Sequence, residues 1–196
     1  ADQIQVLSPT RKGVCGTVNL NRALQAALNP PAANKRQKLW GDMVFREGDR
    51  VMQTRNNYDV VWEKDDGAMG AGIFNGDVGV IQEIDPSGEL ITIQFDDRTC
   101  VYTADLLNQL DMAYAMTVHK AQGSEYRCVV LVSAAVAPAL MVRGVLYTAI
   151  TRARELLVLV GDDVAPGQMA ANDRQQRRYS GLRRRLREEA ANHGME

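Results

Sequence analysis

The sequence predicts an α/β protein in which a parallel-sheet domain is interrupted by a small antiparallel β-barrel. Largely apolar segments at 4–7, 113–116, 128–132 and 156–160 alternate with helical patterns, which is typical of a parallel sheet covered on both faces. Short strands separated by tight turns fill residues 48–111, as in small barrels. The sign of the net charge also changes at the start of this region. Residues 1–46 hold seven basic and two acidic residues, whereas residues 47–111 hold four basic and fourteen acidic residues.

The first segment, residues 1–47, predicts a strand, a loop and a helix. The strand ends at Ser8-Pro9-Thr10, and the polar residues Arg11-Lys12-Gly13 follow as a loop. We expect Thr17 to cap a helix whose apolar stripe consists of Leu20, Leu24 and Leu28. Asn29-Pro30-Pro31 ends this helix.

The middle segment, residues 48–111, predicts the antiparallel barrel. Asn75-Gly76-Asp77 and Pro86-Ser87-Gly88 are tight-turn signals between alternating strands. The stretch from Asn56 to Gly72 is polar and contains glycine, so we expect a mobile hairpin or loop that protrudes from the barrel.

The α/β pattern returns over residues 112–165, and residues 166–196 form a basic C-terminal segment with an expected helix over 173–191. The division predicted from the sequence is therefore one parallel-sheet domain (1–47 and 112–165), one inserted barrel (48–111) and one basic helix.

Composition excludes several classes of protein. Three cysteines without a CxxC pair and two histidines exclude zinc sites of ordinary spacing, and we expect no metal site in this chain. No apolar run approaches the roughly 20 residues that a membrane helix needs, and the N-terminus has no signal-peptide pattern. We therefore expect a cytoplasmic protein without a membrane partner.

Two segments carry candidate chemistry. Residues 117–125 (TVHKAQGSE) follow an apolar strand, where open α/β sheets place ligands, and combine hydroxyl, imidazole, ammonium and amide groups with a glycine. Residues 147–154 (YTAITRAR) end an apolar helical run with two arginines, whose guanidinium groups match phosphate oxygens.

These segments resemble conserved motifs of superfamily 1 DNA helicases. TVHKAQGSE resembles motif V, LYTAITRAR resembles motif VI, and VLSPTRKGVCGTVNLNRALQ resembles motif IV with its following helix. GDRVMQTRNNY and FNGDVGVI resemble the insert of the RecD/TraA branch, the exodeoxyribonuclease V alpha-subunit-like helicases, and DRQQRRYSGLRRRL resembles that branch's C-terminal helix. The resemblance covers nearly the whole chain.

The resemblance implies a RecA-like, P-loop NTPase-type second motor domain interrupted by an SH3-like barrel. The chain contains no GxxxxGK[ST] loop, and the resemblance implies that this Walker A element and the Walker B acid belong to a first motor domain that precedes it. The implied function is the C-terminal part of an ATP-dependent 5′→3′ DNA helicase, a hydrolase of DNA repair and recombination. This chain alone is then expected to be inactive.

The resemblance also implies roles for individual residues. Arg152 matches the motif VI arginine that reaches the γ-phosphate as an arginine finger. The implied ATP-binding residues are Arg11, Gln122, Gly123, Glu125 and Arg154. The implied DNA-binding residues are Thr117, His119, Asn56 and Tyr58, with Tyr58 stacking on a base.

The implied cofactors are ATP and Mg²⁺, bound mainly by the first motor domain. The implied partners are single-stranded DNA, the first motor domain and nuclease or helicase subunits. Two other functions stay open: a non-catalytic nucleic-acid or protein binding module, and a degenerate motor scaffold in a nuclease–helicase complex.

Each candidate residue also has a structural reading. Arg152 could complement a helix dipole, His119 could be an ordinary histidine, and Arg11 with Lys12 could form a solvated turn. The three cysteines are expected to be packing residues.

Overall fold

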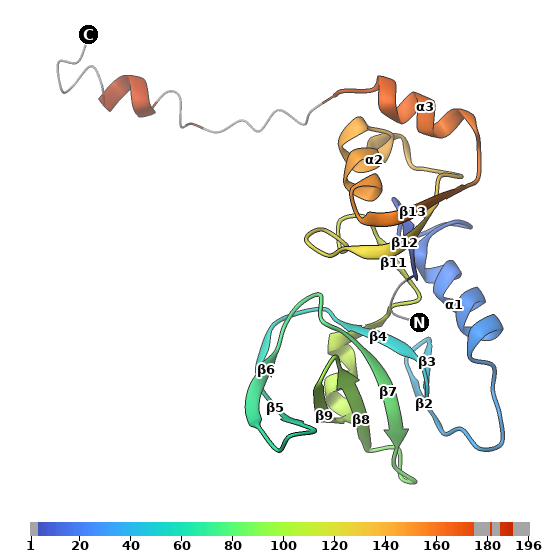
Figure 1. Cartoon of the computed structure of the whole chain (residues 1–196), viewed down its shortest axis with the longest axis vertical. Helices are drawn as coiled ribbons and strands as arrows, with labels where there is room; N and C mark the ends of the chain where they lie inside the picture. Colours follow the sequence, from blue (N-terminus) through green and yellow to red (C-terminus); the bar gives the residue numbers. More distant parts are fainter. Residues whose placement is uncertain (1–3, 175–180, 182–184, 190–196) are drawn as a thin grey trace.

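The computed structural model describes residues 4–174, 181 and 185–189, and residues 4–171 form two lobes (Figure 1). The first, here the parallel lobe, contains a four-stranded parallel sheet in the order β11-β1-β12-β13. Its strands are β1 (Ile4–Ser8), β11 (Ala115–Thr117), β12 (Tyr126–Val132) and β13 (Ala153–Val160). Its helices are α1 (Thr17–Leu28), η2 (Pro138–Leu140), α2 (Arg143–Ile150) and α3 (Val164–Ala171). The predicted apolar strands are thereby confirmed.

The second lobe, here the insert, is a seven-stranded antiparallel sheet in the order β10-β4-β7-β8-β9-β5-β6. Its strands are β4 (Arg50–Gln53), β5 (Asn57–Lys64), β6 (Met69–Ile73), β7 (Val78–Ile84), β8 (Leu90–Phe95), β9 (Arg98–Thr103) and β10 (Leu110–Met112). A hairpin of β2 (Gln37–Trp40) and β3 (Met43–Arg46) precedes the sheet, and η1 (Ala104–Gln109) lies between β9 and β10. Phe45 of this hairpin is buried in the insert core, although it precedes the predicted boundary at residue 48.

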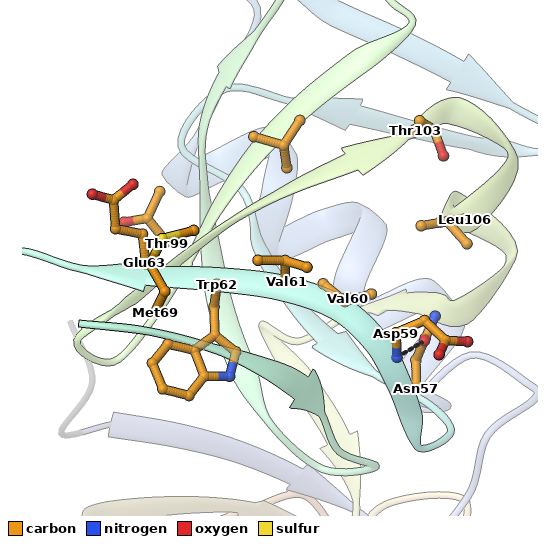
Figure 2. A pocket seen from close by; sticks show the side chains of 11 residues that line it. Asn57, Asp59, Val60, Val61, Trp62, Glu63, Met69, Thr99, Thr103 and Leu106 are labelled. Carbon is orange, nitrogen blue, oxygen red and sulfur yellow. Dashed lines mark hydrogen bonds between the residues drawn. The ribbon is translucent and has the colours of Figure 1, made fainter. Parts of the chain in front are cut away.

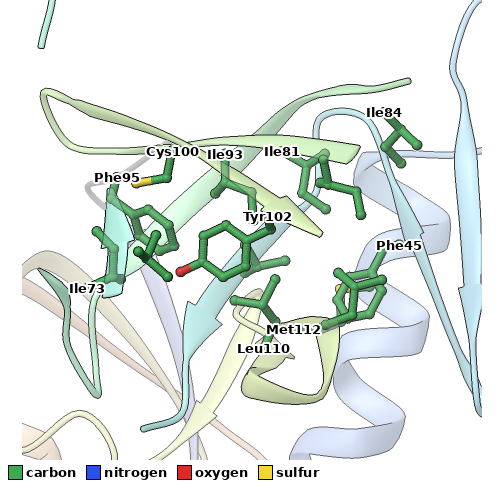
Figure 3. Close-up of a cluster of buried hydrophobic side chains, with 14 of the residues drawn as sticks. Phe45, Ile73, Ile81, Ile84, Ile93, Phe95, Cys100, Tyr102, Leu110 and Met112 are labelled. Carbon is green, nitrogen blue, oxygen red and sulfur yellow. The ribbon is translucent and has the colours of Figure 1, made fainter. Parts of the chain in front are cut away.

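Large side chains fill the insert core (Figure 3). Phe95 and Tyr102 are fully buried, with their ring centroids 6.1 Å apart. The Tyr102 hydroxyl donates a hydrogen bond to Gln53 Oε1 at 3.2 Å, and burial raises the pKa of this phenol. The insert therefore has an apolar centre of its own, separate from the core of the parallel lobe.

The stretch from Asn56 to Gly72 contains a hairpin, as one of the two predicted alternatives states, but this hairpin is part of the seven-stranded sheet and does not protrude from it as a loop. It forms the hairpin β5–β6, and β5 also pairs with β9 through Trp62 and Cys100. The Trp62 ring lies against Gly70, where an added Cβ would be 2.3 Å from the ring. Glycine at this position lets the large indole fold back over the hairpin, a tertiary contact that a polar, glycine-containing sequence does not reveal.

Helix α1 has the predicted length but a different cap and a different buried face. Gly16 is the N-cap residue, and Thr17 lies inside the helix and is buried. A Cβ on Gly16 would be 2.5 Å from the Arg11 carbonyl oxygen, so glycine is needed where the loop returns to the helix. Leu28 is 68% exposed, whereas Asn21 is buried and binds the backbone of Met112 and Ala115.

A buried aspartate joins the two lobes. Asp49 lies at the start of β4 and is fully buried. Its carboxylate accepts hydrogen bonds from Gln25 Nε2 (2.6 Å) and Asn29 Nδ2 (2.7 Å) at the end of α1. It also accepts from the Tyr114 hydroxyl (2.9 Å) and the Arg46 N–H (2.7 Å). This carboxylate therefore connects α1, the segment before β11 and the insert.

The parallel sheet is not covered on both faces by the described residues, in contrast to the prediction. Val145, Leu146 and Ala149 of α2 pack in the core cluster with Leu7 and Leu131. On the opposite face, the aligned side chains of β1 and β13 stay partly open to solvent, namely Ile4, Leu156, Val158 and Val160. The predicted helix over 173–191 falls largely outside the described residues. Within that range, residues 185–189 are described and are helical.

Candidate nucleotide and DNA sites

Residues 118–124 connect two opposite ends of the parallel sheet. The segment begins after Thr117, at the carboxyl end of β11, and continues through turns in which Ala121 N–H donates to Thr117 O and Ser124 N–H donates to Ala121 O, both at 3.1 Å. It then enters β12 at its amino end. Because β11 and β12 run parallel, the motif V candidates divide into one group near Thr117 and one near Ser124.

Arg152 belongs to the second group, here the arginine corner (Ser124, Glu125, Thr148, Thr151, Arg152 and Arg154). It is half-buried at the end of α2. Its guanidinium donates from Nε to Thr148 O (3.1 Å), from Nη1 to Ser124 O (2.9 Å) and from Nη2 to Thr151 Oγ1 (3.2 Å). A guanidinium has more donors than these contacts use, so Arg152 is held in one orientation and retains capacity for a phosphate.

The other predicted nucleotide residues of this corner are exposed. Glu125 and Arg154 form an ion pair of 3.9 Å between two exposed side chains. Gln122 and Gly123 are exposed on the turn, and Gly123 has φ +93°, a conformation that favours glycine. An added Cβ on Gly123 would meet nothing within 4 Å, so the space beside this backbone is open.

Arg11 lies in the first group, here the strand-end cluster (Arg11, Asp111, Thr117, His119 and Lys120). Asp111 of β10 pairs with Arg11 Nη2 at 3.6 Å and with Lys120 Nζ at 3.3 Å. Lys120 N–H donates to Thr117 Oγ1 at 3.3 Å, and His119 is exposed beside them. The structure thus brings Arg11, expected at the nucleotide, next to the residues expected at DNA.

Sequence reasoning missed Asp111, because its partners come from distant segments and no local motif marks it. It also missed Ser124, whose carbonyl oxygen orients Arg152. Side-chain identity could not reveal this role, since the contact is made by backbone.

Asn56 and Tyr58 lie on the insert, at the start of the hairpin β5–β6. Both side chains are exposed, and Asn56 Nδ2 is 3.5 Å from the Tyr58 hydroxyl. Asn56 Oδ1 also accepts a hydrogen bond from Asn75 N–H at 3.0 Å, which ties the start of β5 to the turn before β7. The Tyr58 ring is in edge contact with Phe74, which the sequence analysis did not select.

The insert has a groove of about 530 Å³ along β5 and β9 (Figure 2). Its lining includes Val61, Trp62, Val101 and Leu106 together with the acidic Asp59 and Glu63. None of the predicted site residues lines it.

Among residues 4–174, 181 and 185–189, no cluster of His, Cys, Asp or Glu side chains is arranged to hold a metal ion. The helices of the same ranges lack the length and apolar character needed to cross a membrane. Burial raises the pKa of the Cys100 thiol to about 11, so this cysteine is a neutral core group near pH 7.

Two family models match the chain, one over most of the insert and one over the second part of the parallel lobe. Residues 20–95 match the SH3 domain of ATP-dependent RecD-like DNA helicases. Residues 112–160 match the C-terminal domain of UvrD-like helicases, which includes the 117–125 segment and Arg152.

Curated relatives resemble almost the whole chain. The ATP-dependent RecD2 DNA helicase of Deinococcus radiodurans is 35% identical over 94% of this chain and 23% of its own length. The RecBCD enzyme subunit RecD of Mycolicibacterium smegmatis is 31% identical over 95% of this chain and 30% of its own length. The chain therefore spans less than a third of the relatives that it matches.

A solved structure shows the same fold. The crystal structure of Bacteroides Pif1 bound to single-stranded DNA superposes with a TM-score of 0.54 at 14% identity, covering 99% of this chain and 47% of that one. The resemblance to RecD-type helicases is thus confirmed by the family models and the relatives, and the fold agrees with it. The chain is thus similar to part of the RecD-type helicases, with one region that matches their SH3 domain and one that matches the UvrD-like C-terminal domain.

Proposed function

We propose that this chain is the second motor domain of an ATP-dependent DNA helicase that moves 5′→3′ on single-stranded DNA. The observation that carries the proposal is the geometry of Arg152, which is fixed between the motif V turn and the motif VI helix with donors to spare. The names of the curated relatives and the absence of a GxxxxGK[ST] loop from this sequence support it.

Arg152 would contact the γ-phosphate of an ATP that is held by the P-loop of a first motor domain. Its guanidinium would offset the negative charge that develops on the transferring phosphoryl group. Gln122, Gly123 and Glu125 lie on the connected turn, so closure of the two motor domains around ATP would move this turn and change the grip on DNA. Mg²⁺ would be held mainly by the first motor domain, where it would neutralise charge between the phosphates.

The strand-end cluster would hold DNA phosphates. Lys120 and Arg11 supply positive charge, and Thr117 and His119 supply hydrogen-bonding groups at the same end of the sheet. The grouping of Arg11 with Lys120 supports a role at DNA for this arginine in place of the nucleotide role expected from motif IV. The partners would be single-stranded DNA, the first motor domain and the subunits of a nuclease–helicase complex, in the cytoplasm.

The experiment compares ATP hydrolysis by the 196-residue chain with hydrolysis by the full-length gene product that contains it. We expect no DNA-stimulated hydrolysis by the chain alone and strong stimulation in the full-length protein. Substantial hydrolysis by the chain alone would contradict the division of labour between two domains.

Direction is tested with duplexes that carry a single-stranded tail on either the 5′ or the 3′ side. We expect the full-length protein to unwind the 5′-tailed duplex. Unwinding of the 3′-tailed duplex alone would contradict the proposed polarity, and ATP-independent DNA binding without unwinding would favour a binding module or scaffold.

A further inference from the structure

The turn that joins β6 and β7 presents an aromatic ring on a fixed backbone. Phe74 N–H donates to Asp77 Oδ2 (3.1 Å), and Asp77 N–H donates to Phe74 O (3.0 Å). Arg98 Nη2 pairs with the same carboxylate at 3.1 Å, and Gly76 N–H donates to Gln53 O at 2.9 Å. These contacts close the turn and attach it to β4, so the position of Phe74 is determined before any ligand arrives.

The Phe74 ring forms a surface pair with Tyr58. The two ring centroids are 5.7 Å apart at an interplanar angle of 73°, and the residues are 41% and 68% exposed. Gly72 has φ +106°, and an added Cβ there would be 3.1 Å from Phe74 Cζ, so the ring is also supported from behind. The hydrogen bond between Asn56 and Asn75 holds the two loops together.

This exposure distinguishes Phe74 from the other phenylalanines. The chain has three, and both Phe45 and Phe95 are fully buried in the insert core. A phenylalanine side chain that stays partly at the surface forgoes part of the free energy that full burial would supply. An apolar ring held rigidly in solvent is therefore well prepared for a planar partner, because little conformational entropy is lost when it binds.

The charge of the insert indicates which part of DNA such a ring would contact. Residues 47–111 carry fourteen acidic and four basic residues, so this lobe repels a phosphate backbone. Stacking on a base requires no positive charge and tolerates any sequence, because every base has a π-face. A nucleobase therefore fits this surface better than a phosphate does.

The position of the turn is consistent with such a contact. Val78, directly after Asp77, packs with Met52 against the core of the parallel lobe. In Figure 1 the β6–β7 turn lies at the end of the insert nearest that lobe. We propose that Phe74, paired with Tyr58, is a platform on which a base of single-stranded DNA stacks while the parallel lobe holds the phosphates; this inference rests on the proposed function.

Titration of the 196-residue chain with a fluorescein-labelled 16-nucleotide oligothymidine at several salt concentrations tests this proposal. The Phe74→Ala variant should bind about tenfold more weakly at every salt concentration, with an unchanged slope of log affinity against log salt. The Phe74→Trp variant should keep the affinity. The matched control is Met69→Ala, an exposed apolar side chain at the start of β6, the strand that leads into this turn, and it should bind as the unmodified chain does.

An abasic oligonucleotide of the same length and charge separates stacking from other effects. The unmodified chain should lose about the same tenfold on this probe, and Phe74→Ala should lose nothing further. If Phe74→Ala binds oligothymidine normally, or is weakened equally on the abasic probe, the platform is refuted while the proposed function stands. If the unmodified chain binds neither probe at low salt, the DNA-binding part of the proposed function fails instead.

Discussion

The parallel lobe places its candidate functional side chains at the two ends of a sheet, whereas the insert buries its largest side chains and has an acidic composition. In the parallel lobe, Arg152 and Lys120 lie at segments that connect strands, where backbone groups orient them. In the insert, Phe95 and Tyr102 fill the centre, and Phe74 is held at one edge. The difference teaches that a fold with two separate cores can present cationic side chains on one lobe and an aromatic ring on the other, so that each lobe could contact a different part of single-stranded DNA.

The largest expected effect concerns the joint between the lobes. Asp49→Ala removes a buried carboxylate that accepts hydrogen bonds from the side chains of Gln25, Asn29 and Tyr114. Because these hydrogen bonds to a charged group are lost, we expect the free energy of unfolding to fall by about 2–4 kcal/mol, as measured by urea denaturation. Asp42→Ala, at an exposed site, is the control and should change stability by less than about 0.5 kcal/mol. Equal stability of both variants would show that the joint does not depend on this carboxylate.

Two glycine substitutions compare the lobes directly. A Cβ at Gly16 would be 2.5 Å from Arg11 O, and a Cβ at Gly79 would be 2.7 Å from Gln94 O. Both Gly16→Ala and Gly79→Ala should cost about 1–3 kcal/mol of stability. Only Gly16→Ala should also weaken binding of oligothymidine, because it displaces the loop that carries Arg11. A similar loss of affinity in Gly79→Ala would remove this distinction between the lobes.

A smaller effect is expected where the insert restrains the cations of the parallel lobe. Asp111 pairs with Arg11 and Lys120, so Asp111→Asn frees both for phosphates. We expect oligothymidine binding to tighten about two- to fivefold and its salt dependence to become steeper. Asp105→Asn removes the same charge from the exposed face of η1 and is the control. Identical gains in the two variants would mean that net charge alone matters.

The smallest expected effect concerns the turn of the insert that contains Asp85, whose contribution to stability should depend on pH. The Ser87 hydroxyl and the Leu90 N–H hold the pKa of Asp85 at about 2, below its ordinary value of 3.8. A lowered pKa stabilises the folded state above the ordinary value, and this contribution is lost as the pH falls from 3.8 toward 2. Asp85→Asn should therefore lower the melting temperature at pH 7, and the difference from the unmodified chain should shrink near pH 2. A difference that is constant with pH would contradict this origin.

The strands of the parallel lobe could be predicted because each is a short apolar run between turn residues. The cap and the buried face of α1 could not, because Gly16 is fixed by a contact with the Arg11 backbone and Asn21 by hydrogen bonds across the fold. Local helix patterns favour leucines for burial, yet tertiary hydrogen bonds place an asparagine there instead.

The candidate site divides in the same way. Motif patterns predict roles for Arg152 and Thr117 from the sequence alone, since each belongs to a compact segment, and these roles stay predictions. Asp111 and Phe74 became visible only in the structure, because their partners Lys120 and Tyr58 are distant in sequence. The one local signal for Phe74 is a phenylalanine directly before an Asn-Gly-Asp turn, where exposed apolar rings are uncommon.

The central claim is that this lobe supplies an arginine to a nucleotide held elsewhere, and DNA-stimulated ATP turnover of the full-length protein tests it most directly. Arg152→Ala should lower turnover about 1,000-fold or more, whereas Arg127→Ala, which breaks an exposed ion pair with Glu155 at the neighbouring strand ends, should leave it nearly unchanged. Turnover of the Arg152→Ala protein within about threefold of the unmodified protein would contradict the account.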